Sequence, residues 1–267
     1  MKIENLVVTM NQKNIKKYDE LNLKSDAVIA NQGKENKYIE FTKNKNTVKF
    51  ITTNTKGVGI NRNISLIYSS GDICLFSDDD MKYYSNYAEI VEEAFNKLKD
   101  ADIIIFNIDT IGKNVNRRIN QKIKRVNKFN FLNYGTVRIA FKRKSIFNKN
   151  IWFSTMFGGG TTYSSGEDTL FLAEAIRKKL KIYTYPASIA SVDQSNSTWF
   201  DGYNEKFFFD KGALISQVFP FFQYIFILFY FPLRFKSSLS TVMKQKLMLI
   251  GSRMYKHGIS YDEWKKL

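Results

Sequence analysis

Three consecutive aspartates, Asp78, Asp79 and Asp80, follow the apolar run at residues 73–76 and Ser77. Adjacent carboxylates repel one another, so a divalent cation or its phosphate ligands would neutralise them. Mg2+ and Mn2+ prefer oxygen ligands, and Mg2+ typically takes one or two carboxylates and completes its shell with water and substrate phosphates. The cluster therefore predicts a Mg2+ or Mn2+ site that holds a diphosphate. The alternative is a solvated acidic turn.

A glycine-containing segment lies one expected helix before these aspartates. It contains Lys56, Gly57, Gly59 and Arg62. Glycine permits a close approach of the backbone, and an arginine can bind phosphate through two parallel hydrogen bonds. A pair of glycines is weak evidence alone, but its position before the aspartate strand favours a phosphate-binding role.

A second acidic pair, Glu167 and Asp168, follows Gly166 and a glycine loop at residues 158–160. One of these carboxylates can act as the general base that takes the proton of an attacking hydroxyl group. The alternative is that both only complement the dipole of the helix that begins there. The only histidine, His257, is expected at the surface, which excludes a Ser-His-Asp triad, and no zinc-ligand cluster or phosphate-loop motif is present.

Short apolar runs alternate with helix-compatible stretches through the first half of the chain. This alternation predicts an α/β fold with a mostly parallel, doubly wound sheet, whose ligands bind at the carboxyl ends of the strands. The aspartates lie at such an end. The expected strands are residues 6–9, 27–30, 48–51, 73–76 and 103–108, and the expected helices are residues 14–21, 57–70 and 85–99, the last capped by Ser85.

The later elements are less regular. Residues 136–141 alternate in polarity and predict a strand added at the other side of the sheet. A helix is expected from Glu167 to Lys179, where basic residues complement its dipole, and a further strand over residues 181–185 is expected to stop at Pro186.

The composition of the 267-residue chain fits one large domain or one domain with an appendage. Lys and Arg outnumber Asp and Glu by 41 to 25, and the net charge of +16 predicts attraction to nucleic acid, an anionic membrane or phosphorylated small molecules. The single cysteine, Cys74, lies in an apolar run and is expected to be buried. Residues 1–12 lack the apolar core of a signal peptide, so we expect a cytoplasmic protein.

The composition changes at Gly212, and residues 219–235 are dominated by phenylalanine, tyrosine, isoleucine and leucine. A membrane-spanning helix needs about 20 apolar residues, and this segment is interrupted by two prolines and a glutamine. The pattern favours an in-plane or shallowly inserted segment, and a buried helix pair is the alternative. The basic side chains expected to reach anionic headgroups are Arg234, Lys236, Lys244 and Lys246.

Together these features resemble the inverting glycosyltransferases of family 2, which have the GT-A fold, and especially bacterial enzymes that build capsular or other surface polysaccharides. The likeness covers about residues 2–186. Residues 6–11 resemble the first strand and nucleotide loop, residues 57–63 the G-x-x-x-A-R-N segment, residues 71–80 the G-D-x-x-x-F-x-D-x-D signature, and residues 166–168 the E-D motif.

The resemblance implies a role for each matching residue. Asp80 would be the direct metal ligand, Asp78 would lie near the ribose or the metal, and Asp168 would be the catalytic base, with Glu167 beside it. The remaining residues expected to bind the donor nucleotide are Thr9, Asn11, Asn31, Gly57, Arg62 and Asp79. One base with no second nucleophilic carboxylate implies direct displacement with inversion, in which the metal stabilises the departing nucleoside diphosphate.

The chain departs from the family pattern in two places. Asn31 stands where the family often has an Asp-rich turn, which puts the usual carboxylate contact to the nucleobase in doubt. The Q-x-x-R-W motif of processive synthases is missing, and residues 197–199 are its nearest substitute, so we expect the addition of a single sugar.

We therefore expect a nucleotide-sugar-binding half at residues 1–110, an acceptor-binding half at 111–211 and a helical membrane-associating region at 212–267. The expected reaction moves one sugar from a nucleotide-sugar, taken as a UDP-sugar, to a lipid-linked oligosaccharide at the inner face of the cell membrane. Two alternatives stay open: a nucleotidyltransferase that acts on a sugar phosphate, and a basic nucleic-acid-binding protein, for which no compact recognition motif is found.

Overall fold

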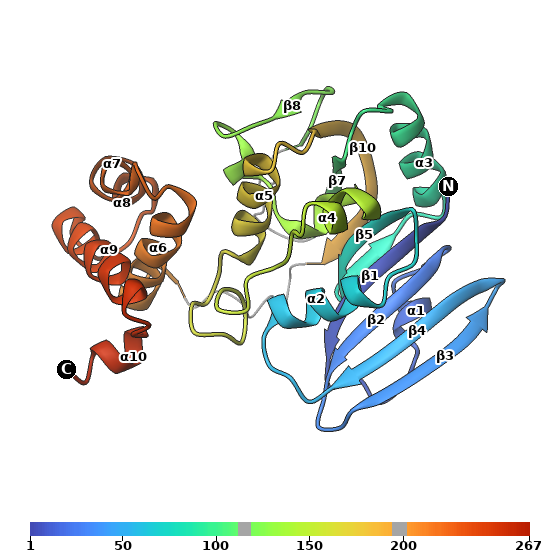
Figure 1. Cartoon of the computed structure of the whole chain (residues 1–267), viewed down its shortest axis with the longest axis horizontal. Coiled ribbons are helices and arrows are strands. Elements are labelled where there is room, and N and C mark those ends of the chain that lie inside the picture. Colours follow the sequence, from blue (N-terminus) through green and yellow to red (C-terminus); the bar gives the residue numbers. More distant parts are fainter. Residues whose placement is uncertain (112–118, 194–201) are drawn as a thin grey trace.

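The computed structural model describes residues 1–111, 119–193 and 202–267 (Figure 1). The segment at residues 197–199 and the first part of the basic stretch at 113–128 lie outside the described residues. The strands are β1 Ile3–Met10, β2 Asp26–Gln32, β3 Lys37–Lys43, β4 Asn46–Thr53, β5 Ile73–Asp78, β6 Met81–Tyr83, β7 Ile103–Ile111, β8 Arg125–Val126, β9 Ile139–Lys142 and β10 Ile182–Asp193.

Helices surround this sheet and form a separate group at the C-terminal end of the chain (Figure 1). They are α1 Lys17–Glu20, α2 Val58–Ile67, α3 Tyr87–Lys97, α4 Arg143–Asn148, α5 Glu167–Arg177, α6 Glu205–Val218, α7 Gln223–Ile225, α8 Phe231–Arg234, α9 Thr241–Lys256 and α10 Tyr261–Trp264. Short 3-10 turns lie at Phe131–Asn133 and Thr136–Arg138, and a π-helical turn lies at Phe226–Tyr230.

One sheet runs through the described part of the chain in the order β3-β4-β2-β1-β5-β9-β7-β10-β6, with β8 paired to β10. Strand β1 pairs in parallel with β2 and β5, β2 with β4, and β7 with β10. The predicted apolar strands and their helices are present, and the doubly wound arrangement is confirmed. These strands are apolar on both faces because helices α1 and α3 cover one side and α2, α4 and α5 the other.

The predicted strand at residues 136–141 is only partly correct. Residues Thr136–Arg138 form a 3-10 turn, and β9 begins at Ile139. The strand does not extend the other side of the sheet, because it lies antiparallel between β5 and β7. Ile139, Ala140 and Phe141 are all buried, as expected for a strand covered on both faces.

Two further expectations are wrong. Strand β10 continues through Pro186 to Asp193, because shifts in its register against β7 between Thr184 and Ser188 accommodate a residue that has no N–H. Helix α3 is not capped by Ser85, since its N-cap is Asn86, which makes no side-chain capping bond.

The hairpin of β3 and β4 was not predicted. Its turn residues, Asn44 and Lys45, both have positive φ angles of 49° and 67°, which is the conformation of a tight hairpin turn. The alternation of exposed and half-buried residues along β3 is the sequence signal that identifies such a strand.

The C-terminal unit, residues 205–267, consists of α6 to α10 and lies beside the α/β part in Figure 1. Its two longest helices, α6 and α9, cross closely: a Cβ on Gly212 would lie 1.9 Å from Met248 O, and one on Gly251 would lie 2.0 Å from Phe209 O. Among the described residues, none of the helices is long and apolar enough to span a membrane. The expected boundary between residues 211 and 212 falls within α6, and the division into three parts stays a prediction.

Candidate active site

The aspartate cluster lies where β5 ends, next to the carboxyl end of β1. Asp78 is the last residue of β5, and its side chain is 39% exposed. A cavity of about 390 Å3 opens there, between the strand ends, α2 and the start of α5. It brings together most of the predicted site residues, namely Thr9, Arg62, Asp78, Asp79, Asp80, Glu167 and Asp168.

Arg62 connects the two acidic groups of this cavity. It is 5% exposed, and its guanidinium group donates to Asp78 Oδ1 at 2.9 Å and to Glu167 Oε1 at 2.7 Å. The guanidinium carbon also lies 5.4 Å from the centre of the Phe153 ring. Burial alone would lower the pKa of Arg62, but the charges of Asp78 and Glu167 outweigh it and raise that pKa. Arg62 is therefore a fixed charge that ties β5 to α5.

Thr9 and Asp79 form a second connection between strand ends. The Thr9 hydroxyl donates to Asp79 Oδ2, so the last residues of β1 fix this carboxylate. Lys17 Nζ lies 3.4 Å from the backbone carbonyl oxygen of Asp79. The same Nζ pairs with Glu20 Oε2 at 2.8 Å, so this contact ties α1 to the cluster.

Glu167 and Asp168 are the first two residues of the eleven-residue helix α5. Burial, and then the neighbouring charge of Asp168, raise the pKa of Glu167 above its ordinary value, and Arg62 partly offsets this rise. Asp168 Oδ1 accepts a hydrogen bond from Thr169 N at 2.6 Å, whereas Glu167 is engaged by Arg62. The two adjacent carboxylates thus have different partners.

The glycine segment before α2 packs against the glycine loop at residues 158–160. Gly57 N donates to Gln32 Oε1 at 2.9 Å, and Val58 N donates to Gly159 O at 3.0 Å. A Cβ on Gly59 would lie 2.0 Å from Ser154 O, so the close backbone approach there is to the chain itself. In this structure Gly57 bonds to the end of β2, and the following residue, Val58, holds the loop that precedes α5.

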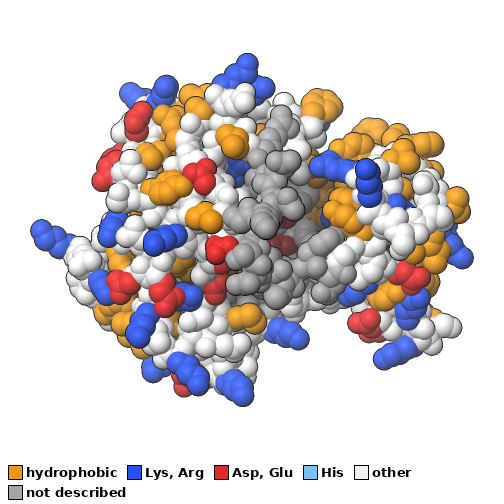
Figure 2. Space-filling model, turned by 180° about the vertical axis from the view of Figure 1, so that it is seen from behind, with side chains coloured by type: hydrophobic (Ala, Val, Ile, Leu, Met, Phe, Trp, Pro, Cys, Tyr) orange, Lys and Arg blue, Asp and Glu red, His pale blue; other side chains and the backbone are white. Residues whose placement is uncertain are grey.

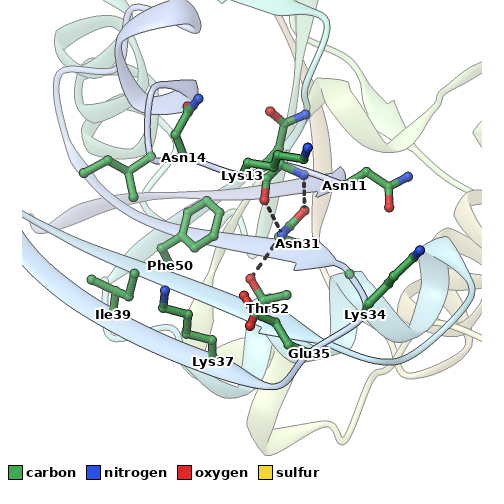
Figure 3. A pocket seen from close by; sticks show the side chains of 13 residues that line it. Asn11, Lys13, Asn14, Asn31, Lys34, Glu35, Lys37, Ile39, Phe50 and Thr52 are labelled. Atoms are coloured by element: carbon green, nitrogen blue, oxygen red, sulfur yellow. Dashed lines mark hydrogen bonds between the residues drawn. The ribbon is translucent and has the colours of Figure 1, made fainter.

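Asn11 and Asn31 lie in a neighbouring cavity of about 430 Å3 at the ends of β1, β2 and β4 (Figure 3). Asn31 Oδ1 accepts from Gln12 N at 3.0 Å, and Asn31 Nδ2 donates to Gln12 O and Thr52 Oγ1, both at 3.1 Å. Asn31 therefore fixes the loop after β1. The cavity also contains the basic side chains Lys13, Lys34 and Lys37.

The two cavities are neighbours along the chain. Thr9 and Met10 line the smaller cavity and Asn11 and Gln12 the larger, and Gln32 and Asn31 divide in the same way at the end of β2. Consecutive residues at the ends of β1 and β2 thus line different cavities.

The acidic side chains of this cavity could provide only part of the coordination shell of a divalent cation. In residues 1–111, 119–193 and 202–267, no three acidic, histidine or cysteine side chains converge into a metal centre. Asp78 and Asp80 both line the cavity and would supply the one or two carboxylates that Mg2+ takes when substrate phosphates complete its shell. The donor set therefore fits a cation that binds together with a diphosphate.

The sequence interpretation missed two buried residues near this cavity. Asn61 Nδ2 donates to Thr9 O at 3.1 Å and to Ala30 O at 2.8 Å, which holds α2 against the ends of β1 and β2. Asp210 on α6 binds Ser164, close to the start of α5. Asn61 was visible as a neighbour of Arg62, but nothing in the sequence joined Asp210 to the site.

The expected burial of Cys74 and exposure of His257 are both confirmed. One expected headgroup contact is wrong. Lys244 is 6% exposed and points inward, because its Nζ donates to Phe235 O at 2.8 Å, whereas Arg234, Lys236 and Lys246 are exposed.

Known proteins support this interpretation. Residues 27–163 match the family model "Glycosyl transferase family 2". S. aureus TarS residues 1–349 in complex with UDP-GlcNAc superimposes with a TM-score of 0.61 at 15% identity, over 96% of this chain and 73% of that chain. The same TarS fragment with UDP gives 0.60 at 14% identity, over 100% and 78%. No curated protein sequence matches significantly.

These structural likenesses, at 14–15% identity, concern the fold, and they confirm the predicted GT-A fold. The family match spans the aspartate cluster, Arg62 and the glycine loop, and it covers more than half of the chain. The chain belongs to glycosyltransferase family 2 and is a glycosyltransferase.

Proposed function

We propose that this glycosyltransferase transfers one sugar from a UDP-sugar to a hydroxyl group of a lipid-linked saccharide, with inversion. The observation that carries the proposal is the cavity of about 390 Å3, which is lined both by Asp78, Asp79 and Asp80 at the end of β5 and by Asp168 at the start of α5. Since the two groups lie at different strand and helix ends, donor binding and proton removal can occur on opposite sides of one sugar.

The two neighbouring cavities suggest how the donor lies. We assign the nucleoside to the larger cavity with Asn11 and Asn31, and the diphosphate and sugar to the smaller one. The complex of TarS with UDP-GlcNAc supports a UDP-sugar as the donor, because that protein has the same fold. Thr9 lines the smaller cavity and fixes Asp79 through its hydroxyl group.

In the proposed reaction, Asp168 takes the proton of the acceptor hydroxyl as its oxygen attacks the anomeric carbon. The bond from that carbon to the diphosphate breaks, and the nucleoside diphosphate leaves. Glu167 holds Arg62, and Arg62 holds Asp78, so the two sides of the site keep a fixed spacing. A Mg2+ or Mn2+ ion held by Asp80 and Asp78 would supply positive charge that stabilises the departing diphosphate.

Replacement of Asp80 by alanine is expected to weaken metal-dependent donor binding, because it removes a carboxylate at the diphosphate end of the cavity. A thermal-shift screen of UDP-, GDP- and dTDP-sugars, with and without Mn2+, measures this. We expect the wild type to gain stability with a UDP-sugar and Mn2+ together, and Asp80→Ala to lose that gain. An equal Mn2+-dependent gain in both proteins would contradict the role of Asp80.

We place the enzyme at the inner face of the cell membrane, as part of surface polysaccharide synthesis, because of its C-terminal unit. Apolar side chains gather over that unit in the rear view of the molecule (Figure 2). The segment after α6 exposes large apolar side chains that a protein core does not cover, while Arg234, Lys236 and Lys246 lie nearby in the chain. Within residues 219–235 the most exposed of these are Phe221 at 91%, Leu233 at 70% and Phe229 at 68%.

The double variant Phe221→Ser, Phe229→Ser is expected to bind anionic vesicles at least about tenfold more weakly, since burial of one phenylalanine is worth about 1.5–3 kcal/mol. Flotation with phosphatidylglycerol-containing vesicles measures the bound fraction. The matched control is Phe129→Ser, which removes an 84% exposed phenylalanine outside the C-terminal unit and should bind as the wild type does. Unchanged vesicle binding by the double variant would refute the proposal that this apolar surface binds the membrane.

A further inference from the structure

The C-terminal unit contacts the segment that leads to Asp168. Asp210, on α6, is 2% exposed, and its Oδ2 accepts hydrogen bonds from Ser164 N at 3.0 Å and Ser164 Oγ at 2.8 Å. Lys206 Nζ, one turn earlier on α6, lies 2.7 Å from the same oxygen and also donates to Thr162 O at 3.2 Å. Residues 162–164 are therefore held to α6 by both Asp210 and Lys206.

A second contact fixes the chain just before α5. Gly166 has a φ of +118°, which side-chain-bearing residues rarely adopt, and a Cβ there would lie 2.6 Å from Leu214 Cδ1. Leu214 lies one turn after Asp210 on α6. The helix thus packs on the two ends of the segment 164–166, and Glu167 and Asp168 follow directly.

Lys211, next to Asp210 on α6, also interacts electrostatically with Asp168. Burial lowers the pKa of Lys211, which follows Asp210, and the negative charges of Asp168 and Asp210 partly offset this effect. A buried carboxylate such as Asp210 is costly unless it is paired and hydrogen-bonded. Asp210 Oδ2 is paired with Lys206 and hydrogen-bonded to Ser164, and these contacts define the conformation of residues 162–164.

We propose that Asp210 is a positioning residue for sugar transfer: by fixing Ser164 it sets the path of residues 164–166 and hence the place of the Asp168 carboxylate. The C-terminal unit, which presents the apolar surface, then also forms part of the catalytic apparatus. This inference rests on the proposed role of Asp168 as the base.

The test compares Asp210→Ala and Asp210→Asn with Asp262→Ala, which changes an exposed aspartate of α10 in the same unit. Displacement of a catalytic group by about 1 Å costs on the order of 100-fold in rate, so we expect kcat of Asp210→Ala to fall by about that factor. Donor affinity, measured by calorimetry, should not change. Asparagine can still accept from Ser164 but loses the charge pairing with Lys206, so its kcat should lie between those of Asp210→Ala and the wild type.

Hydrogen exchange of residues 162–170 gives a readout that does not need transfer activity. The amide of Ser164 should exchange faster in Asp210→Ala than in Asp262→Ala, because its acceptor is gone. If Asp210→Ala does not fold, Asp210→Asn provides the test. We then expect a smaller loss of kcat and an unchanged affinity for the donor. Wild-type kcat in folded Asp210→Ala would overturn the proposal, whether or not the exchange of Ser164 changes. If the wild type transfers no sugar but the amide of Ser164 still exchanges faster in Asp210→Ala than in Asp262→Ala, the proposed function is refuted. The structural contact between Asp210 and Ser164 is then still supported.

Discussion

Replacement of Asp168 by asparagine is expected to lower kcat for sugar transfer by about 10²- to 10⁴-fold, the usual contribution of a general acid or base. Asparagine has the same size and can still accept the hydrogen bond that Thr169 N donates at 2.6 Å. The start of α5 should therefore keep its shape while the ability to take a proton is lost. Initial rates at saturating donor and acceptor measure the effect.

The affinity of Asp168→Asn for the nucleotide-sugar should equal that of the wild type. The carboxylates proposed to bind the nucleotide-sugar lie elsewhere, at the end of β5. Glu167→Gln is the matched comparison, since it changes the adjacent carboxylate but can keep one bond to Arg62. Full transfer by Asp168→Asn would refute the base assignment. If Glu167→Gln alone were inactive with normal donor binding, Glu167 would be the base instead.

Replacement of Arg62 by methionine is expected to lower the free energy of unfolding by about 3–5 kcal/mol, the range measured when one partner of a buried ion pair is removed. Glu167, whose side chain is 13% exposed, would then lack its guanidinium partner while Asp168 lies next to it. Denaturant unfolding at several pH values measures this loss. Arg177→Met, which breaks a half-exposed ion pair on α5, should change stability by less than about 1 kcal/mol.

The pH dependence of Arg62→Met follows from the direction of the pKa shift. Burial already raises the pKa of Glu167, and loss of Arg62 removes the main effect that lowers it. The folded variant then binds more protons than the unfolded chain, so its stability falls as the pH rises through the interval between the two pKa values. The deficit should shrink toward acidic pH, and Arg62→Met, Glu167→Gln should recover part of it. A deficit that does not vary with pH would contradict this account.

The donor side of the site was predictable from the sequence for a physical reason. Parallel strands are buried on both faces, so β1, β2, β4, β5 and β7 are visible as short apolar runs. The carboxyl ends of such strands meet at one edge, so strand order alone brings the end of β1, with Thr9, close to Asp79 after β5. At this edge of the sheet, the local sequence pattern and the strand order therefore predict the same site.

Contacts between distant segments were not predictable. Arg62 and Glu167 are 105 positions apart, and Ser164 and Asp210 are 46 apart, so no spacing rule relates them. The position of β9 depends on pairing with β5 and β7, which outweighs its local pattern. Lys244 was expected at the surface from its type alone, but carbonyl groups of the preceding segment bind it inside the unit.

The arrangement joins two parts of the proposed reaction. The apolar surface of the C-terminal unit would place a lipid-linked acceptor near the bilayer, and α6 of the same unit contacts the segment before Asp168.

The nucleotide product tests the central claim most directly. The chain is incubated with UDP-, GDP- and dTDP-sugars, Mn2+ and a detergent extract of bacterial membrane lipids, and the products are identified by phosphorus NMR. We predict release of a nucleoside diphosphate, UDP, in the wild type and its loss in Asp168→Asn. No consumption of any nucleotide-sugar would contradict the account, and so would release of pyrophosphate in a parallel incubation with a nucleoside triphosphate and a sugar phosphate.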